Sequence, residues 1–456
     1  MTSLDSPTVP VEAPPSRHAL GNLIWSPSRA ARLLRRVNVS LLFLCGLWVE
    51  ATQPVASLQR PVLYGMKDFL QDYDLARAII QHMDPYLPIS ALAQRVLGVT
   101  LSPPLLLPTP HPPTLGLLLL PITVLDYPAA AALWLVFETA CLVISIYLLG
   151  RNVGVRLGIL ATLVIATIAV AWFPVSHELV LGQLTLPILL LLVAAERLLQ
   201  SGRRTVGGAL IGLSILLKPI AWPVLLIFVV RRSWRPLAGA LPTILAGAAA
   251  AVAAIGFGGV FAYATQVLPS VARAYHAADR NISLWTVGWR VFEGMGSPVM
   301  PEMSAPPLIQ SPVAASVVSA GLPVVILVAA LVAIRKRSEA TSFGLMLCVA
   351  VLISPISWIQ DLILVLIPVV GVGAWLLRHN LPSRQTNFAL LVAVMLVLGD
   401  DWTRLAFLVG EITAFNSTGL IPFAPALLNL GPAVAVGALA SLLIVLPDAP
   451  AEVRDE

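Results

Sequence analysis

The chain has 456 residues, of which 58% are hydrophobic and 11% are charged, and its mean hydropathy is +0.89. A soluble globular protein carries about 25% charged residues, so this composition excludes one and predicts an all-α polytopic membrane protein. The formal net charge of +5 comes without the clustered basic patch of a nucleic-acid binder, and we expect no nucleic-acid partner.

The two ends of the chain are predicted to be cytoplasmic tails. Residues 1–28 are rich in Pro, Ser and Thr, which is typical of disorder, and residues 448–456 form a short second tail. Several arginines precede the first apolar run, which extends from Val37 to about Thr52. They place the start of that run in the cytoplasm. Residues 29–447 therefore form one transmembrane domain.

The rest of the domain alternates apolar segments with two long loops, 54–113 and 259–311. Segment 115–125 is too short to span comfortably, so we expect it not to cross. The other segments are 129–150, 154–173, 184–198, 206–217, 219–230, 236–258, 312–334, 342–355, 358–377, 387–400 and 424–447. Several are short, which predicts tilted or Pro-broken helices, and the total is about 12 crossings.

Charge bias fixes the orientation of this threading. Most Lys and Arg residues fall on the side of the two termini, and most acidic residues fall on the opposite side. The positive-inside rule therefore places both termini in the cytoplasm and both long loops outside. Nearly all of the polar motifs then lie on the external side.

The first external loop contains KDFLQDYDLARAIIQHMDPYLP, residues 67–88. A helix beginning near Asp68 would carry acidic residues in its first turn, where the helix dipole favours them. We expect this helix to lie along the membrane surface with an apolar side on the lipid, formed by Leu75, Ala78, Ile79 and Met83. Asp68 at such a boundary is a candidate general base, whereas Asp72 and Asp74 fit equally well on a solvated polar face.

Lys218 lies within the apolar run LLKPIAWP, where an ammonium group is costly unless it is paired or functional. It could bind an anionic ligand such as a lipid phosphate. It could instead form an internal ion pair with Glu178 or Asp361, or extend its amine to the membrane interface. The residue types alone leave these alternatives open.

Three further polar residues are candidates on the same side. His111, within PHPPT, could donate a hydrogen bond to phosphate or belong to a rigid proline-flanked loop. Gln183 and Asn281 could bind a hydroxyl or phosphate, and each could equally cap a helix end. None of these signals is specific by itself.

The chain lacks a Walker A loop, a GxGxxG turn, an HExxH motif and any Cys/His metal pattern. We therefore expect no metal and no cofactor. The short internal connections leave no room for a cytoplasmic nucleotide-using domain. If the protein is an enzyme, its activated donor should reach the external face within the membrane, carried on a lipid.

The ordered motifs DFLQDYDLARAI, HPPT, LGQ, GLSILLKP, NISL and LISPISW, spread over residues 40–380, resemble glycosyltransferase family 87. This family uses polyprenyl-phosphate sugars and has the GT-C fold. It is related to bacterial α-mannosyltransferases and arabinofuranosyltransferases of cell-envelope glycolipids. The resemblance implies a multispan inverting transferase in the bacterial plasma (inner) membrane, with its active site on the periplasmic side.

The resemblance implies roles for particular residues. Asp68 would deprotonate the acceptor hydroxyl of a glycolipid or glycan, which displaces the lipid phosphate in line. Contacts with donor or acceptor would come from Asp72, Tyr73, His111, Gln183, Lys218, Asn281, Ser357, Trp358 and Gln360. Where many relatives have histidines after SPISW, this chain has Ile359-Gln360-Asp361, so Gln360 or another group would take over their role.

The competing hypothesis is a transporter or flippase of a lipid-linked envelope precursor. Such a protein would show a repeat between its two halves, and the sequence shows none. The large polar first loop also favours a surface enzyme site. A non-catalytic subunit of an envelope-assembly complex is the third possibility.

Overall fold

The computed structural model describes residues 29–58, 68–296, 304–379, 383–399, 402, 404–405, 408 and 423–446. In these residues the backbone is helical, apart from turns and two isolated bridges, Asn281 with Trp358 and Met295 with Ala305. The predicted all-α class is therefore confirmed. The predicted tails, 1–28 and 448–456, lie outside the described residues.

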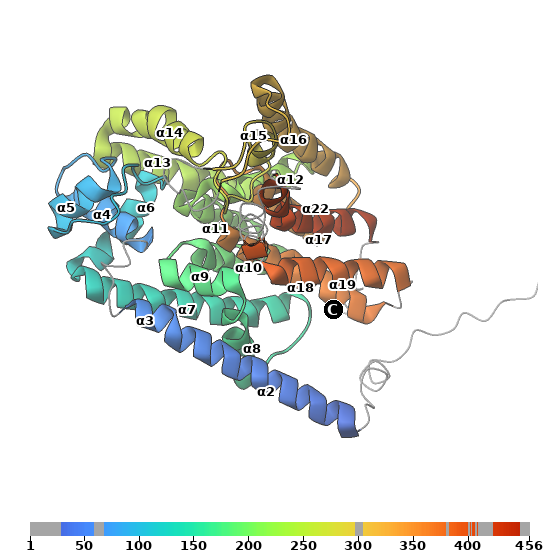
Figure 1. Ribbon diagram of the computed structural model, residues 1–456. Coiled ribbons are helices and arrows are strands. Elements are labelled where there is room, and N and C mark those ends of the chain that lie inside the picture. The colour runs from blue at the N-terminus through green and yellow to red at the C-terminus, as the bar shows by residue number, and fades with distance from the viewer. Residues whose placement is uncertain are drawn as a thin grey trace, which may run out of the picture.

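The helices follow one another through short connections (Figure 1). In chain order they are α2 Arg29–Thr52, α3 Pro54–Ser57, α4 Asp68–Ile80, α5 Ile89–Leu97, α6 Pro113–Leu119, η1 Leu120–Val124, α7 Tyr127–Asn152, α8 Ile159–Val170, α9 Phe173–Leu181, α10 Thr185–Gln200, α11 Arg204–Leu217, η2 Pro219–Val224, α12 Leu225–Val230, α13 Trp234–Ala262, η3 Tyr263–Val267, α14 Leu268–Ala274, α15 Trp285–Phe292, α16 Pro312–Ala333, α17 Glu339–Ile353, η4 Ile359–Val365, α18 Leu366–Arg378, α19 Ser383–Leu398, α21 Ala424–Leu428 and α22 Gly431–Val445.

Among the described residues, six helices are long and apolar enough to cross a membrane, or seven if the bent pair α8–α9 is one broken span. The prediction of about 12 crossings is not confirmed. Several predicted crossings correspond to apolar helices of 10–17 residues, such as Arg204–Leu217 and Pro219–Val230. A span needs about 20 residues. The first of these helices stops before Pro219 and the second contains Pro223, and a proline removes a backbone donor and breaks a helix.

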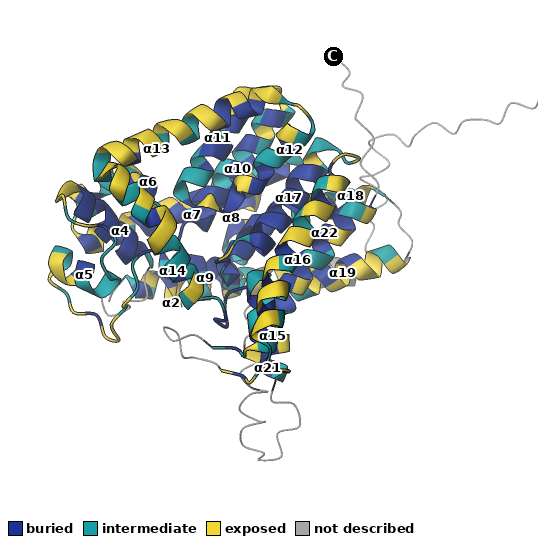
Figure 2. Ribbon diagram, turned by 90° about the horizontal axis from the view of Figure 1, so that it is seen from above, coloured by how far each residue is buried: buried dark blue, intermediate teal, exposed yellow. Residues whose placement is uncertain are grey.

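The outer helices turn large apolar side chains outward. Val313, Val317 and Val324 on α16 are each more than half exposed, as is Leu245 on α13. Figure 2 shows this exposed surface on α13 and α19, while α17 and α4 are mostly buried. Exposed apolar rows of this length fit hydrocarbon rather than water, so the chain is a multi-pass membrane protein.

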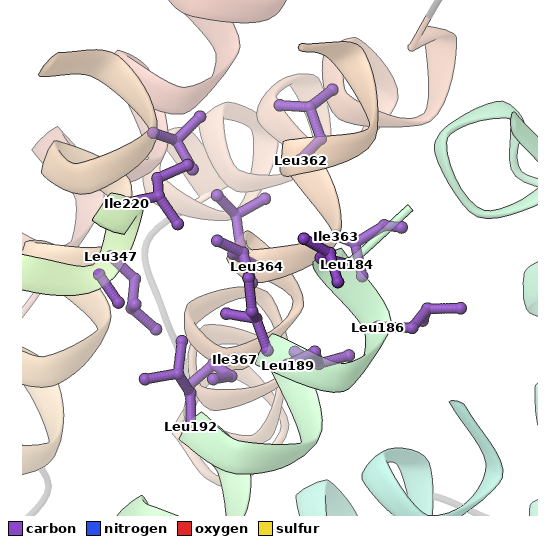
Figure 3. Close-up of a cluster of buried hydrophobic side chains, with 14 of the residues drawn as sticks. Leu184, Leu186, Leu189, Leu192, Ile220, Leu347, Leu362, Ile363, Leu364 and Ile367 are labelled. Atoms are coloured by element: carbon purple, nitrogen blue, oxygen red, sulfur yellow. The ribbon is translucent and has the colours of Figure 1, made fainter. Parts of the chain in front are cut away.

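The core lies where short, broken helices meet around α17, which is buried from Ser342 to Ile353. Figure 3 shows Leu189 and Leu192 of α10 beside Ile367 of α18 and below Leu364 of η4, with Ile220 of η2 at the other end of the same cluster. Because these elements are short, their ends lie inside the protein rather than in solvent. Polar groups at those ends need partners from neighbouring helices.

Helices α11 and α13 approach each other closely. A Cβ at Gly208 would lie 1.8 Å from the carbonyl oxygen of Pro236, so only glycine allows the two backbones to make this contact. Small residues at such crossings are the usual means of packing membrane helices, because they allow extensive van der Waals contact. The contact holds α11 rigidly at the position from which Lys218 follows.

Helix α4 does not lie on the lipid as expected. Leu75 and Ala78 are 0% exposed and Ile79 is 7% exposed, because α4 packs against α5, α6, η1 and α7. An interfacial helix is thus not confirmed, and the assignment of these three side chains to the lipid is wrong. The apolar residues of α4 are covered by α5 of the same loop and by α6, η1 and α7, which follow it in the chain.

A separate cavity of about 580 Å³ lies between the α2–α3 region and α7. Apolar residues form most of its wall, and Glu50 is its one ionisable lining residue among those described. One carboxyl oxygen of Glu50 is buried there and has no hydrogen-bond partner in the described part of the chain. None of the polar motifs singled out in the sequence lines this cavity.

Candidate active site

The site begins with Asp68, the first residue of α4. Asp68 is partly exposed, whereas Asp72 and Asp74 on the same helix are 0% exposed. Asp84, the fourth aspartate of the segment, is exposed and accepts a hydrogen bond from the backbone N–H of Tyr86 at 2.9 Å. Asp68 is therefore the one carboxylate of the four that is neither fully enclosed nor part of a surface turn.

Gln183 is brought to Asp68 by the turn between α9 and α10. Its Nε2 donates a hydrogen bond to Oδ2 of Asp68. The preceding residue, Gly182, has φ +67°, and a Cβ there would lie 2.8 Å from the Cβ of Phe69. Glycine is the residue that accepts this left-handed conformation without strain. The glycine of the LGQ motif is therefore needed for the turn that brings Gln183 to Asp68.

An aromatic cluster supports the turn from behind. The Phe69 and Trp134 rings stack with centroids 5.1 Å apart, and Trp134 Nε1 donates to the carbonyl of Gly182 at 3.1 Å. Tyr73, predicted to bind substrate, instead donates its hydroxyl to the carbonyl of Leu125 at 2.8 Å and is 2% exposed. Its place is in the packing of the first loop.

His111 meets the second aspartate of α4. Its Nδ1 lies 2.5 Å from Oδ1 of Asp72, and both side chains are nearly inaccessible. The backbone around the ring is also held, because Tyr86 donates to the carbonyl of His111 at 3.2 Å and Tyr263 donates to that of Pro110 at 2.9 Å. The proline-flanked loop is thus rigid, and it also presents a paired imidazole.

Lys218 ends α11 and forms an ion pair with Asp361 of η4, with Nζ–Oδ distances of 2.7 and 2.9 Å. Of the partners that the sequence left open, Asp361 is the one found. The same carboxylate accepts from the backbone N–H of Trp358 at 2.9 Å and from Thr185 Oγ1 at 3.2 Å. Lys218 is 9% exposed, so it does not extend to the membrane interface.

Glu178 closes the N-terminus of α10. Its Oε1 accepts from the backbone N–H of Thr185 and, at 3.0 Å, from that of Leu186. Carboxylates at helix N-termini satisfy free N–H groups and complement the helix dipole. The start of α10, the end of α11 and the start of η4 therefore meet, with Glu178, Lys218 and Asp361 at their junction.

Asn281 connects two of the predicted motifs. Its side-chain amide donates to the carbonyls of Tyr275 and Pro355, both at 3.2 Å. Its carbonyl oxygen accepts from the backbone N–H groups of Ser283 and Ser357. All of these partners are protein groups, so Asn281 joins NISL to SPISW. These bonds to backbone groups are closer to the helix-capping role that the sequence left open than to a role in binding a hydroxyl or phosphate.

The remaining predicted residues are Ser357 and Trp358, next to the bridge with Asn281, and Gln360 at the start of η4. Ser357 is 0% exposed, and its Oγ has no hydrogen-bond partner among the residues that the structure describes. Trp358 is half-buried, with its ring 5.0 Å from that of Tyr275. Gln360 is buried in η4 at 2% exposure, so Trp358 is the more accessible of the three.

Arg290, which is 0% exposed in α15, was not among the residues predicted for the site. Its guanidinium donates to the carbonyls of Ala278, Asp279 and Asn281 and so holds the loop before NISL. Burial lowers the pKa of Arg290 to about 10, and the nearby Asp279 charge opposes this shift. A lone arginine in WTVGWRVF could have been noticed as a charge in an apolar helix.

The carboxyl groups of α4 are in an environment that favours their neutral form. Burial raises the pKa of Asp68 to about 7; the positive charge of His111 lowers it, the charge of Asp72 raises it, and Lys218 lowers it. Burial likewise raises the pKa of Asp72, against the charge and hydrogen bond of His111. A carboxyl group with a pKa near the working pH is suited to accept a proton during a reaction.

Within the described ranges, no group of three or more His, Cys, Asp or Glu side chains could hold a metal ion. The arrangement offers instead a partly accessible carboxylate, a histidine and a lysine. The charges of His111 and Lys218 both act on Asp68 and on Asp72. Such a set can accept a proton at one point and stabilise negative charge at another.

The family model described as glycosyltransferase family 87 matches residues 110–355, more than half of the chain. The segment includes His111, Gln183, Lys218 and Asn281 but ends before Trp358, and Asp68 precedes it. The chain is also 33% identical over 134 residues to proteins named alpha-(1->3)-arabinofuranosyltransferase from two Mycobacterium tuberculosis strains, CDC 1551 / Oshkosh and ATCC 25618 / H37Rv. That alignment covers 29% of this chain and 31% of each relative. No solved structure matches.

Proposed function

Because this chain belongs to glycosyltransferase family 87, we propose that it is a membrane glycosyltransferase that moves a sugar from a polyprenyl-phosphate donor to a glycolipid or glycan acceptor. The sugar is of the mannose or arabinofuranose class. The names of the two mycobacterial relatives support arabinofuranose. Membrane lipids surround the protein and supply the donor.

The observation that carries this proposal is the state of Asp68. It is partly exposed, it accepts a hydrogen bond from Gln183, and its pKa is raised to about 7. A base must be accessible to the acceptor hydroxyl and must bind the proton it removes. Asp72 and Asp74 are fully enclosed, so neither can meet an acceptor as readily.

The reaction is an inverting displacement. Asp68 removes the proton of the acceptor hydroxyl, the acceptor oxygen bonds to the anomeric carbon from one side, and the bond to the lipid phosphate breaks on the other. Lys218 supports the phosphate: an ammonium group has three N–H donors, so its contact with Asp361 leaves donor capacity for a ligand. Gln183 holds Asp68 in place for the acceptor.

The site faces the external side of the bacterial plasma membrane in this proposal. Helix α11 runs from Arg204 to Leu217, next to Lys218, a length of about 20 Å at 1.5 Å per residue. At its start, Arg204 pairs with Glu339 at 2.6 Å, and the neighbouring loops contain Arg231, Arg232 and Arg335. The positive-inside rule assigns that arginine-rich end to the cytoplasm.

The test is a transfer assay in detergent with purified protein. Polyprenyl-phosphate arabinofuranose or mannose is the donor, and a panel of glycolipids supplies acceptors. Product formation with one donor is the expected result. Absence of transfer with every pair, together with protein-dependent scrambling of the donor lipid in vesicles, would replace the enzyme by a flippase.

Asp68→Asn is the decisive variant in this assay. It keeps the size of the side chain but cannot accept the proton, so we expect turnover to fall by about 10²- to 10⁴-fold. Donor binding, measured separately, should stay near normal. Asp84→Asn is the matched control, because Asp84 lies in a surface turn of the same segment. Turnover of the Asp68 variant equal to that of the control would assign the base elsewhere.

A further inference from the structure

The contact between Asp72 and His111 has a geometry that the proposed function does not use. Asp72 is 0% exposed, and its Oδ1 lies 2.5 Å from Nδ1 of His111. A carboxylate on one imidazole nitrogen fixes the tautomer and the orientation of the ring. Nδ1 then carries a proton toward Asp72, and Nε2 is the nitrogen available for other work.

Nε2 of His111 has no hydrogen-bond partner among the described residues, and it is not one of the fully buried polar atoms. The main chain of the loop is held on both sides of the ring by Tyr86 and Tyr263. Thr109 Oγ1 also accepts from the backbone N–H of His111 at 3.2 Å. These contacts fix the backbone of the loop, and the contact of Nδ1 with Asp72 fixes the ring, so the position of Nε2 is set.

The loop of His111 also contacts the end of α11, next to Lys218, which is proposed above to bind the phosphate. Thr114, in the first turn of α6, donates its hydroxyl to the carbonyl of Leu216 at 2.5 Å, two residues before Lys218. The loop of His111 and the end of α11 are therefore fixed to each other. A phosphate held by Lys218 would have the imidazole of His111 on the side of the first loop.

The charges around His111 come from several elements. Asp68 and Asp72 belong to α4, and Lys218 follows α11. The hydroxyls of Tyr86 and Tyr263 donate hydrogen bonds to backbone carbonyls of the loop that contains His111. Beyond Lys218 lie Asp361 of η4 and Glu178 of α9. The imidazole therefore lies among four carboxyl groups and one lysine, which come from α4, α9, η4 and the end of α11.

We infer that His111 gives a proton to the departing lipid phosphate, with Asp72 as the positioning residue that orients the ring and stabilises its charged form. The inference rests on the proposed function. Asp68 takes the proton of the acceptor hydroxyl, and the oxygen–carbon bond forms. The electrons of the bond between the anomeric carbon and the phosphate oxygen go to that oxygen. Nε2–H then transfers its proton to an oxygen of the phosphate.

The products balance in this step. The acceptor becomes a glycoside, the donor becomes a polyprenyl hydrogen phosphate, Asp68 is neutral and His111 is neutral. A proton then moves from Asp68 to solvent and another from solvent to His111, which restores the starting state. Protonation is useful because the second ionisation of a phosphate monoester has a pKa of about 6, so the dianion would otherwise accumulate in a low-dielectric site.

The test is the pH profile of turnover at saturating donor. The wild type should give a bell-shaped curve that rises as Asp68 ionises and falls where His111 loses its proton. His111→Gln should lower turnover by about 10²-fold and remove the falling limb, while the rising limb stays. Asp72→Asn should move the falling limb to lower pH, since the imidazolium loses its carboxylate. Asp72→Glu should restore part of it.

Asp84→Asn again serves as the control and should keep the full bell shape. Asp72 is completely buried, so its variant could fail to fold; His111→Gln then decides alone, with melting temperature as a check. A folded His111 variant that keeps the falling limb overturns the inference. If the wild type transfers no sugar, the proposed function fails instead, and the two failures are distinguishable.

Discussion

Asp68 and Lys218 show how differently two charged residues behave at the same site. Asp68 is partly accessible and is held by one neutral amide, Gln183, whereas Lys218 is nearly enclosed and is held by a full negative charge, Asp361. A charge with an opposite charge beside it is stable as an ion. At Asp68 burial raises the pKa and outweighs the opposing charges of His111 and Lys218, so this carboxyl group shifts toward its neutral form.

The pH dependence of catalysis follows from the pKa of Asp68, which burial raises to about 7. The base must be ionised, so the active fraction decreases as pH falls through 7 and is reduced by about 10²-fold two units below it. Turnover measured between pH 5 and 8 tests this. A flat profile below pH 6 would contradict the assignment, because an ordinary aspartate remains ionised there.

The ion pair between Lys218 and Asp361 gives a second residue-scale prediction. Replacing one partner of a buried pair leaves an uncompensated charge and costs about 3–5 kcal/mol, whereas replacing both by apolar residues is often neutral. We expect Lys218→Met to lower the melting temperature strongly and Lys218→Met with Asp361→Leu to restore it. The double variant should still fail to bind donor. Normal donor affinity in it would show that Lys218 has a purely structural role.

At the scale of elements, the site depends on helices that stop inside the protein. α11 ends at Leu217, before Pro219 removes the next backbone donor, and η4 begins at Ile359. Lys218 directly follows the end of α11, and Asp361 lies in the first turn of η4. The position of α11 is fixed in turn by its contact with α13 at Gly208.

Gly208→Ala should therefore disturb the protein although it adds a single methyl group. That methyl would overlap the carbonyl of Pro236, and overpacking of this kind costs about 1–3 kcal/mol. A lower melting temperature in detergent is the expected result. Gly371→Ala on α18 is the matched control, since a Cβ there has no atom within 4 Å. Equal melting temperatures for the two variants would contradict the close approach.

The whole molecule is polarised, with the site at one end of α11 and arginine-rich loops at the other. In intact cells, a membrane-impermeant maleimide should label Asp84→Cys, in the first loop. It should label Lys336→Cys, between α16 and α17, only after permeabilisation. The native cysteines give little background, because Cys141 and Cys348 are buried and Cys45 lies within the apolar helix α2. The reverse pattern would invert the orientation.

The membrane class, the helical fold and the family could be predicted from composition and from ordered motifs. Which groups pair could not: the residues Lys218 and Asp361 are 143 positions apart, and Glu178 was an equal candidate. The lipid face assigned to α4 was wrong because periodicity finds an apolar side without showing what covers it; α5, α6 and α7 do. The count of crossings was uncertain for a related reason, since broken helices divide one span into two apolar runs.

Position 182 has a consequence for how this protein can change over generations. Every amino-acid replacement of a glycine adds at least a Cβ, and at Gly182 that atom would overlap Phe69 while the backbone has φ +67°. A different side chain at position 69 would not relieve this overlap, because the nearest Phe69 atom is its Cβ, which every residue except glycine has. Lineages that alter sugar or acceptor preference should therefore do so elsewhere, leaving the Gly182–Gln183 pair as it is.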